Sequence, residues 1–134
     1  MYKEIHRSER YFTIFDFLIS HGQFLIRASK NDEYKTNIDI VFFGAKFIQS
    51  IISLYGVVIR PVNKEDVTFN YKSVNRFLTY EHQTLFEIES GEEKYYIVAS
   101  FVKVFENDLG FKESSLGYEG KGREVMIAEW PLKS

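Results

Sequence analysis

Three histidines are the side chains best suited to acid–base or metal chemistry in this sequence, and each of them stands alone. His6, His21 and His82 show neither HxH nor HxxxH spacing, the spacings that place two imidazoles on one face of a strand or helix. His21 precedes Gly22 and His82 follows Glu81 in segments that the pattern predicts to be turns. The chain has no cysteine, which excludes thiolate zinc sites, iron–sulfur clusters, disulfides and cysteine nucleophiles. We therefore predict no metal site and no cofactor.

Two aspartates interrupt otherwise apolar segments, Asp16 within Tyr11–Ile19 and Asp39 within Thr36–Phe43. Paired carboxylates can act as general acid and base when their surroundings separate their pKa values. The alternation of these segments instead favours exposed polar positions on strands for both aspartates. No serine lies in a G-x-S-x-G motif. We predict no catalytic residue, and an enzyme that uses Asp16, Asp39 or His21 in a cleft is the least favoured hypothesis.

An acidic segment follows the longest apolar run, and it supports two interpretations. Its apolar side chains could tuck a loop under a sheet, or its carboxylates could form a recognition loop for a basic partner; EF-hand spacing is absent. The candidate partner-binding residues are Glu106, Asp108 and Glu113, and the apolar ones are Leu109, Phe111 and Leu116. The glycine-rich stretch 117–122 that comes next is neither a P-loop nor a GxGxxG motif and predicts a loop.

Charge is divided unevenly along the chain, although the formal net charge is only -2. Residues 1–80 carry 11 basic and 8 acidic side chains, whereas residues 81–134 carry 6 basic and 11 acidic ones. An acidic surface attracts a basic protein and repels nucleic acid, whose phosphates require clustered Lys and Arg. No segment approaches the roughly 20 apolar residues of a membrane-spanning helix, and the polar N-terminus does not resemble a signal peptide. We expect a cytoplasmic protein that binds neither nucleic acid nor membrane.

Period-two alternation of β-branched and aromatic residues dominates the elements that must position these side chains. Of the 134 residues, 45% are hydrophobic and 17% aromatic. A single helical turn is predicted over Lys72–Leu78. The run Lys94–Phe105 is apolar on both faces, which predicts one long central strand. The other predicted strands are Tyr11–Ile19 and Gln23–Ser29, joined as a hairpin, then Thr36–Phe43, Lys46–Gln49, Val57–Val62, Val67–Tyr71, Thr84–Glu89 and Arg123–Trp130.

Short strands, tight turns and little helix are typical of a mainly β protein. We predict one domain over residues 1–134, an antiparallel β-sandwich or barrel of eight or nine strands whose inward aromatics fill the core. The pattern of one sequence does not separate a sandwich from a closed barrel.

Three strand segments, Gly22–Arg27, Asn37–Phe42 and Phe47–Gln49, resemble small uncharacterised bacterial β-rich proteins. Some of those proteins accompany toxin systems as immunity factors. The resemblance covers about a third of the chain and carries no catalytic residue. It implies a bacterial cytoplasmic binding protein.

The leading hypothesis is therefore a non-enzymatic protein-binding domain, immunity-like, whose acidic surface binds a basic partner. The alternative is a small-molecule-binding β-barrel with an apolar cavity, followed by a hydrolytic enzyme. A homo-oligomer formed through strand edges is compatible with each of them.

Overall fold

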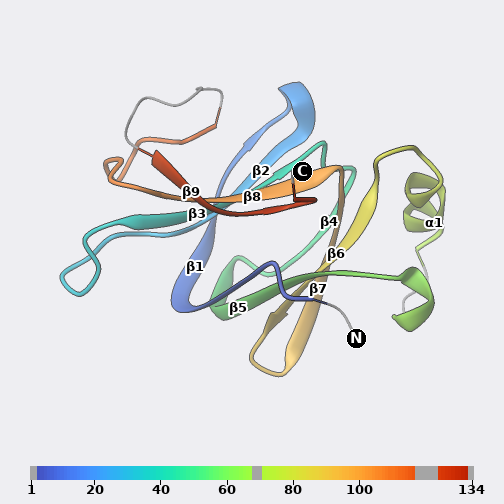
Figure 1. Ribbon diagram of the computed structural model, residues 1–134, viewed down its shortest axis with the longest axis horizontal. Coiled ribbons are helices and arrows are strands. Elements are labelled where there is room, and N and C mark those ends of the chain that lie inside the picture. Colours follow the sequence, from blue (N-terminus) through green and yellow to red (C-terminus); the bar gives the residue numbers. More distant parts are fainter. Residues whose placement is uncertain (1–2, 68–70, 117–123, 133–134) are drawn as a thin grey trace.

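The computed structural model describes residues 3–67, 71–116 and 124–132. Within them, nine strands form one antiparallel sheet in the order β4-β7-β6-β5-β1-β2-β3-β8-β9 (Figure 1). The strands are β1 His6–Leu18, β2 Gln23–Ala28, β3 Asn37–Phe43, β4 Phe47–Gln49, β5 Ser53–Val62, β6 Thr84–Ser90, β7 Glu93–Ala99, β8 Phe101–Asn107 and β9 Glu124–Trp130. The helical elements are the 3-10 turns η1 Ser20–Gly22 and η2 Lys64–Asp66, and the helix α1 Lys72–Leu78. The mainly β, single-bodied architecture and the helical turn are as the sequence predicts.

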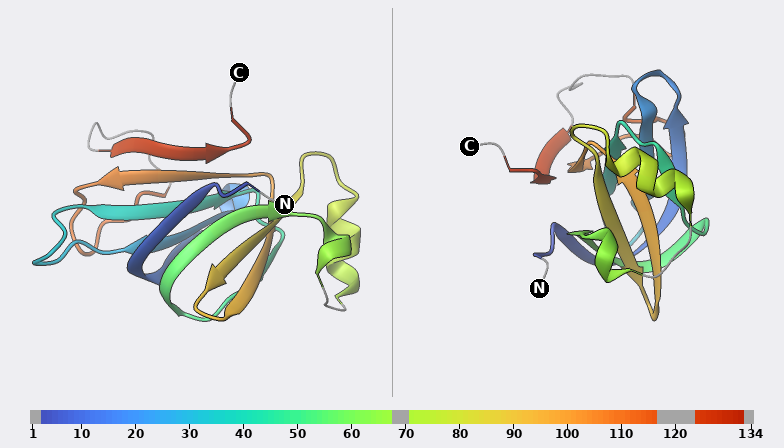
Figure 2. Two further views of the ribbon diagram at one scale, coloured as in Figure 1. Left: turned by 60° about the horizontal axis from the view of Figure 1, so that its bottom comes forward. Right: turned by 90° about the vertical axis from the view of Figure 1, so that its right-hand side faces the viewer.

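The sheet curls on itself because β1 pairs with different strands along its two halves. Its first half pairs with β5 and its second half with β2, and register shifts interrupt both ladders. Such bulges increase the twist and bend a strand. As a result the two ends of the strand order approach each other, and Trp130 of β9 packs on Phe86 of β6 with ring centroids 5.5 Å apart. The sheet does not close, and β4 and β9 are its edges (Figure 2).

Aromatic and aliphatic side chains fill the inside of the curl. Phe12, Phe42 and Phe86 are fully buried, and the rings of Phe42 and Phe86 meet edge to face at 5.6 Å. Burying one such side chain contributes roughly 1.5–3 kcal/mol. The predicted aromatic core is thus present, and it spans the space between strands far apart in the sheet. The other members of this core are Phe24, Ile26, Ala28, Ile38, Ile40, Leu54, Val57, Ile59, Ile88, Tyr95, Ile97, Ala99, Val102 and Val104.

A smaller cluster lies where α1 packs on β7 and β4. Val74 of α1 is fully buried and contacts a group of apolar residues on the outer side of β5, β6 and β7. No described helix is long and apolar enough to cross a membrane. The predicted strand Val67–Tyr71 falls largely outside the described residues, as does the predicted loop 117–122.

The prediction of one long central strand over Lys94–Phe105 was wrong. The run forms two strands, β7 and β8, that separate at Ser100 and join distant parts of the sheet. The backbone N–H of Ser100 donates to the carbonyl of Phe43 at 2.8 Å. Gly44, with a φ of +67°, lies so close that a Cβ there would be 2.6 Å from the Ser100 hydroxyl. The core-facing positions change phase at the break, from Tyr95, Ile97 and Ala99 to Val102 and Val104. Because the run is apolar on both faces, its sequence pattern does not reveal this change.

Asp39 is not an exposed strand residue, contrary to the sequence-based expectation. It is fully buried on the outer face of β3, where both carboxylate oxygens accept hydrogen bonds from Arg27 of β2, at 2.6 and 2.8 Å. Asn107 donates to the same carboxylate at 2.9 Å. Arg27 also donates to the carbonyl of Glu113 at 2.7 Å and lies 4.0 Å from the ring centroid of Phe15. A buried charge requires such complete partnering.

The loop after β8 covers this buried ion pair. Leu109 and Leu116 are buried, whereas Phe111 is 79% exposed. Leu116 packs against Leu25 and Val41 on the outer face of the sheet. Two of the three apolar side chains therefore tuck the loop under the sheet's outer surface, as one of the two sequence interpretations expected.

Candidate binding cleft

The edge strand β9 presents large apolar side chains to solvent. Val125 is 65% exposed, Met126 45% and Ile127 44%, and Leu132 just beyond the strand is 72% exposed. β9 pairs with β8 on one side, and on the other side no described strand pairs with it. An edge strand with unpaired backbone groups and exposed apolar side chains is a template for pairing with another chain.

A bulge divides β9 and fixes which way its side chains point. Val104 and Phe105 are consecutive in β8, but their partners Ala128 and Met126 are not, so Ile127 is the extra residue. Residues paired across strands share a face of the sheet. Ala128 therefore faces the core with Val104, and Met126 faces outward with Phe105.

Trp130 ends β9 and separates two grooves. One groove, of about 370 Å³, lies between β9 and the residues that lead into β1, and its walls include Ile5, Ile127 and Leu132. The backbone N–H of Ile5 donates to the carbonyl of Ile59 at 2.7 Å, which holds this wall against β5. The first groove thus lies along the open side of the sheet.

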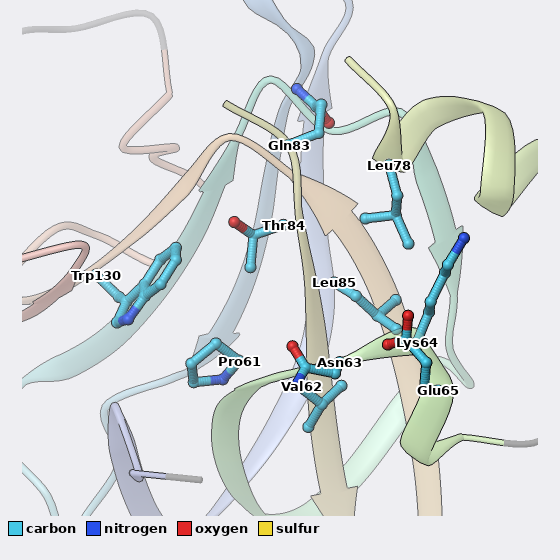
Figure 3. Close-up of a pocket in the computed structure, with 10 residues that line it drawn as sticks. All are labelled: Pro61, Val62, Asn63, Lys64, Glu65, Leu78, Gln83, Thr84, Leu85 and Trp130. Atoms are coloured by element: carbon cyan, nitrogen blue, oxygen red, sulfur yellow. The ribbon is translucent and has the colours of Figure 1, made fainter. Parts of the chain in front are cut away.

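The second groove, of about 480 Å³, lies on the other side of Trp130, between the end of β5, the start of β6 and the end of α1 (Figure 3). Pro61, Leu78 and Leu85 give it apolar walls, and Lys64 and Thr84 add polar groups. Its volume falls within the range of small-molecule sites, about 300–1,000 Å³. Figure 3 shows the indole of Trp130 across the groove from η2.

Ion pairs organise the surface near the start of β1. Arg60 donates to Glu87 at 2.9 Å and to Glu89 at 2.8 Å, and Arg7 pairs with Glu4. The hydrogen bond from Arg7 lowers the pKa of Glu4, and the hydrogen bond from Arg60 lowers the pKa of Glu89.

Glu87, which is nearly buried, has a further partner in the phenol of Tyr96. The Tyr96 hydroxyl donates to its carboxylate at 3.2 Å. Burial, together with the Glu87 charge, raises the pKa of Tyr96 to about 12. These contacts link neighbouring strands, and they pair the carboxylates of Glu4, Glu87 and Glu89 with groups of the same chain.

His6, at the start of β1, supplies a pH-dependent contribution to stability. Its Nε2 is buried without a hydrogen-bond partner, and burial lowers the pKa of the imidazole below the ordinary 6.5. Below about pH 6.5 the His6 imidazole is protonated in the unfolded chain but stays largely neutral in the folded chain. The free energy of unfolding therefore falls as the pH decreases. We expect chemical unfolding to show a smaller loss of stability between pH 7 and pH 5 for His6→Gln than for the native chain. Equal losses would show that His6 does not contribute.

The predicted partner-binding residues lie along β8 and the following loop, and all three take part in intramolecular contacts. The Thr36 hydroxyl donates to the carboxylate of Glu106. The Asp108 carbonyl accepts from Lys30 at 2.9 Å, and the Glu113 carboxylate accepts from the backbone N–H of Gly110 at 2.7 Å. Glu106 also lies directly opposite Val125 of β9. The structure therefore places one of the three on the strand next to β9 and gives Glu113 a role in holding the loop.

The residues considered for catalysis do not form a site. Asp39 is committed to Arg27 and Asn107, while Asp16 accepts a hydrogen bond from the backbone N–H of Phe17 at 2.8 Å. His21 lies in the turn η1 with a φ of 68°. Among the described residues, no group of three or more His, Asp or Glu side chains could hold a metal ion.

Sequence reasoning missed the importance of β9. The segment Arg123–Trp130 was predicted to be a strand, which β9 confirms, but its position at the edge was not. One signal was present: Val125 to Ala128 are four consecutive apolar residues, whereas a strand with one solvent-exposed face alternates apolar and polar residues.

Comparison with known proteins gives no relative: no family model, no curated protein and no solved structure matches this chain.

Proposed function

We propose that this protein is a non-enzymatic protein-binding domain that binds a basic partner along the open edge of β9. The observation that carries the proposal is the exposure of Val125, Met126 and Ile127 on a strand that has only one described strand neighbour, and of Leu132 just beyond its end. Apolar residues gathered on an exposed edge are a liability unless a partner covers them.

Acidic residues around this edge support the basic character of the partner. β9 itself carries Glu124 and Glu129, and Glu106 lies opposite Val125 on β8. Within the described part of β9 there is no basic side chain. Complementary charge increases the rate of association and disfavours acidic partners.

Selection from a display library of short random peptides tests the proposal directly. We expect enriched peptides to bind the native chain and to bind the Val125→Lys/Ile127→Lys variant about tenfold more weakly, because the lysines remove apolar contact and repel basic peptides. Ile52→Lys is the matched control, since Ile52 is 70% exposed just before β5 and should tolerate lysine without affecting binding. Absence of enrichment, or equal binding by both lysine variants, would contradict the proposal.

Charge reversal tests the contribution of the acidic segment separately. We expect Glu106→Lys and Asp108→Lys to weaken binding of the same peptides, mainly through slower association, and raised salt to reduce the difference. Glu113 is a poorer probe because its carboxylate and its carbonyl both hold the loop. Association rates can be measured by surface plasmon resonance. Association rates that do not depend on these charges or on salt would show that the acidic segment is not part of the binding surface.

An immunity-like role is the specific form of this proposal that the resemblance suggests. The basic partner would then be a toxin encoded by a neighbouring gene. Coexpression tests it: the native chain should restore growth of cells that make the toxin, and Val125→Lys/Ile127→Lys should not. If the Val125→Lys/Ile127→Lys variant still restored growth, the immunity role would not depend on the β9 edge.

A small-molecule function is the second candidate, and the groove in Figure 3 is the observation that favours it. The core side chains occupy the inside of the curl, so such a ligand would bind in this open groove. Trp130 is the only tryptophan in the chain, so its fluorescence reports ligands that enter. A ligand that shifts this emission in the native chain should lose the effect in Thr84→Arg, which fills the groove.

A further inference from the structure

We infer that the partner adds a strand to this sheet: an extended segment of alternating basic and apolar residues pairs antiparallel with the outer edge of β9. This inference rests on the proposed function and specifies the partner's conformation and chemistry. Main-chain hydrogen bonds would supply much of the affinity in such a complex, and alternate side chains its specificity.

Two open strand edges border the region that the added strand would enter. β9 has no described strand partner opposite β8. β1 pairs with β2 only from Thr13 onward, so its first half, which β5 pairs on one side, lacks a described strand on the other side. Figure 2 shows β9 and the start of β1 separated at the open side of the curled sheet. The 370 Å³ groove lies between them, bounded by Ile5 and Ile127.

The β8–β9 register determines the chemistry of each face of the added strand. Glu124 and Glu129 pair with Asn107 and Lys103, which face outward, whereas Trp130 pairs with Val102, which faces the core. The outer face of β9 therefore carries Glu124 and Glu129 on either side of Met126, and its inner face carries Val125, Ala128 and Trp130. Side chains of a neighbouring strand follow the same two faces. A matching segment has Lys or Arg toward the outside and apolar residues toward the core, in alternation.

The apolar side chains of such a segment would have contacts on both sides of the groove. Ile5 packs partly against the core from the β1 side, and Ala128 and Trp130 do so from β9. Lys103, the basic residue opposite Glu129, lies 5.6 Å from the ring centroid of Phe101 and 5.9 Å from that of Phe43. Its charge is thus drawn toward the rings of β8 and β3 rather than toward the outer edge.

A second copy of the chain fits this edge less well than a basic segment does. Antiparallel pairing of two β9 strands would place two acidic outer faces side by side, with Glu124 and Glu129 on each strand and no basic residue on either. Like charges on adjacent strands are destabilising. Self-association through β9 is therefore an outcome that the experiment below would detect, and it would contradict the inference.

The test uses three synthetic peptides with the full chain. The first alternates Lys with Val, the second alternates Glu with Val, and the third is the Lys–Val peptide with every second backbone nitrogen methylated. We expect the Lys–Val peptide to bind and to shift Trp130 emission, and each of the other two to bind about tenfold more weakly. Methylation removes N–H donors while preserving side chains and charge, so its effect isolates main-chain pairing.

Amide hydrogen exchange by NMR locates the contact. The Lys–Val peptide should slow exchange at alternate residues of β9, where N–H groups point to the open edge, and should leave β4 unchanged. Equal binding of the methylated or the Glu–Val peptide, no binding of the Lys–Val peptide, protection elsewhere than β9, or dimerisation of the free chain through β9 would each overturn strand addition. In any of these cases, the proposed function would still stand if the binding of the library peptides depended on Val125 and Ile127.

Discussion

Asp39→Ala is expected to lower the free energy of unfolding by about 3–5 kcal/mol, because it leaves the guanidinium of Arg27 buried without its carboxylate. Arg27 is 1% exposed and Asp39 is completely buried, so water cannot replace the lost partner. Asn107 would also lose an acceptor, which adds to the cost. Urea unfolding monitored by circular dichroism measures the change. A loss below about 1 kcal/mol, the range of exposed ion pairs, would contradict the burial described here.

The double substitution Arg27→Met/Asp39→Leu is the matched control. Apolar replacement of a buried ion pair is often neutral or stabilising, so the double variant should be markedly more stable than Asp39→Ala. The stability of the double variant should remain below that of the native chain, because the Glu113 carbonyl loses the hydrogen bond that Arg27 donates. We therefore also expect faster proteolysis in the loop after β8 than in the native chain. A double variant as unstable as Asp39→Ala would show that packing, not charge, dominates at this position.

Most strand positions could be predicted from the sequence because alternation is a local property, although β1 begins at His6 rather than Tyr11 and β5 at Ser53 rather than Val57. Segments such as Thr36–Phe43 and Arg123–Trp130 differ from β3 and β9 by one residue at one end. The partnership of Asp39 could not be predicted in this way. It depends on the register that places Asp39 opposite Arg27, and alternation does not encode register between strands. An apolar strand with one carboxylate is compatible with either an exposed aspartate or a buried ion pair.

The order of the strands in the sheet could not be predicted from the sequence either, for a related reason. Ser100 divides the run Lys94–Phe105 into β7, beside the edge strand β4, and β8, beside the edge strand β9. The apolar pattern is the same for a continuous strand and for two strands that turn onto different parts of the sheet. The candidate cleft at β9 depends on that order, since only the order shows that β9 lies at an edge with its apolar side chains exposed.

Phe86→Ala should be among the most destabilising single substitutions in the core, with a loss of about 3–5 kcal/mol in the free energy of unfolding. Phe86 is fully buried and touches two rings, Phe42 of β3 and Trp130 of β9, with centroids 5.6 and 5.5 Å away. No hydrogen-bonded strand pair joins β6 to β3 or β9. Phe86 therefore links parts of the curl that the sheet itself leaves separate, and its removal creates a cavity at that contact. Urea unfolding gives the stability, and Trp130 fluorescence gives the local effect.

Phe24→Ala separates the local effect from the general loss of core volume. Phe24 is 3% exposed and pairs with Phe42 at 6.3 Å, but it has no ring contact with Trp130. Both variants should lose comparable stability, while only Phe86→Ala should shift the emission of folded Trp130 to longer wavelength, because only there does the indole lose its apolar neighbour. Since Trp130 also divides the two grooves, Phe86→Ala should weaken binding of β9-dependent peptides although it lies outside both grooves. An unchanged emission would mean that β9 is held in place without the Phe86 contact.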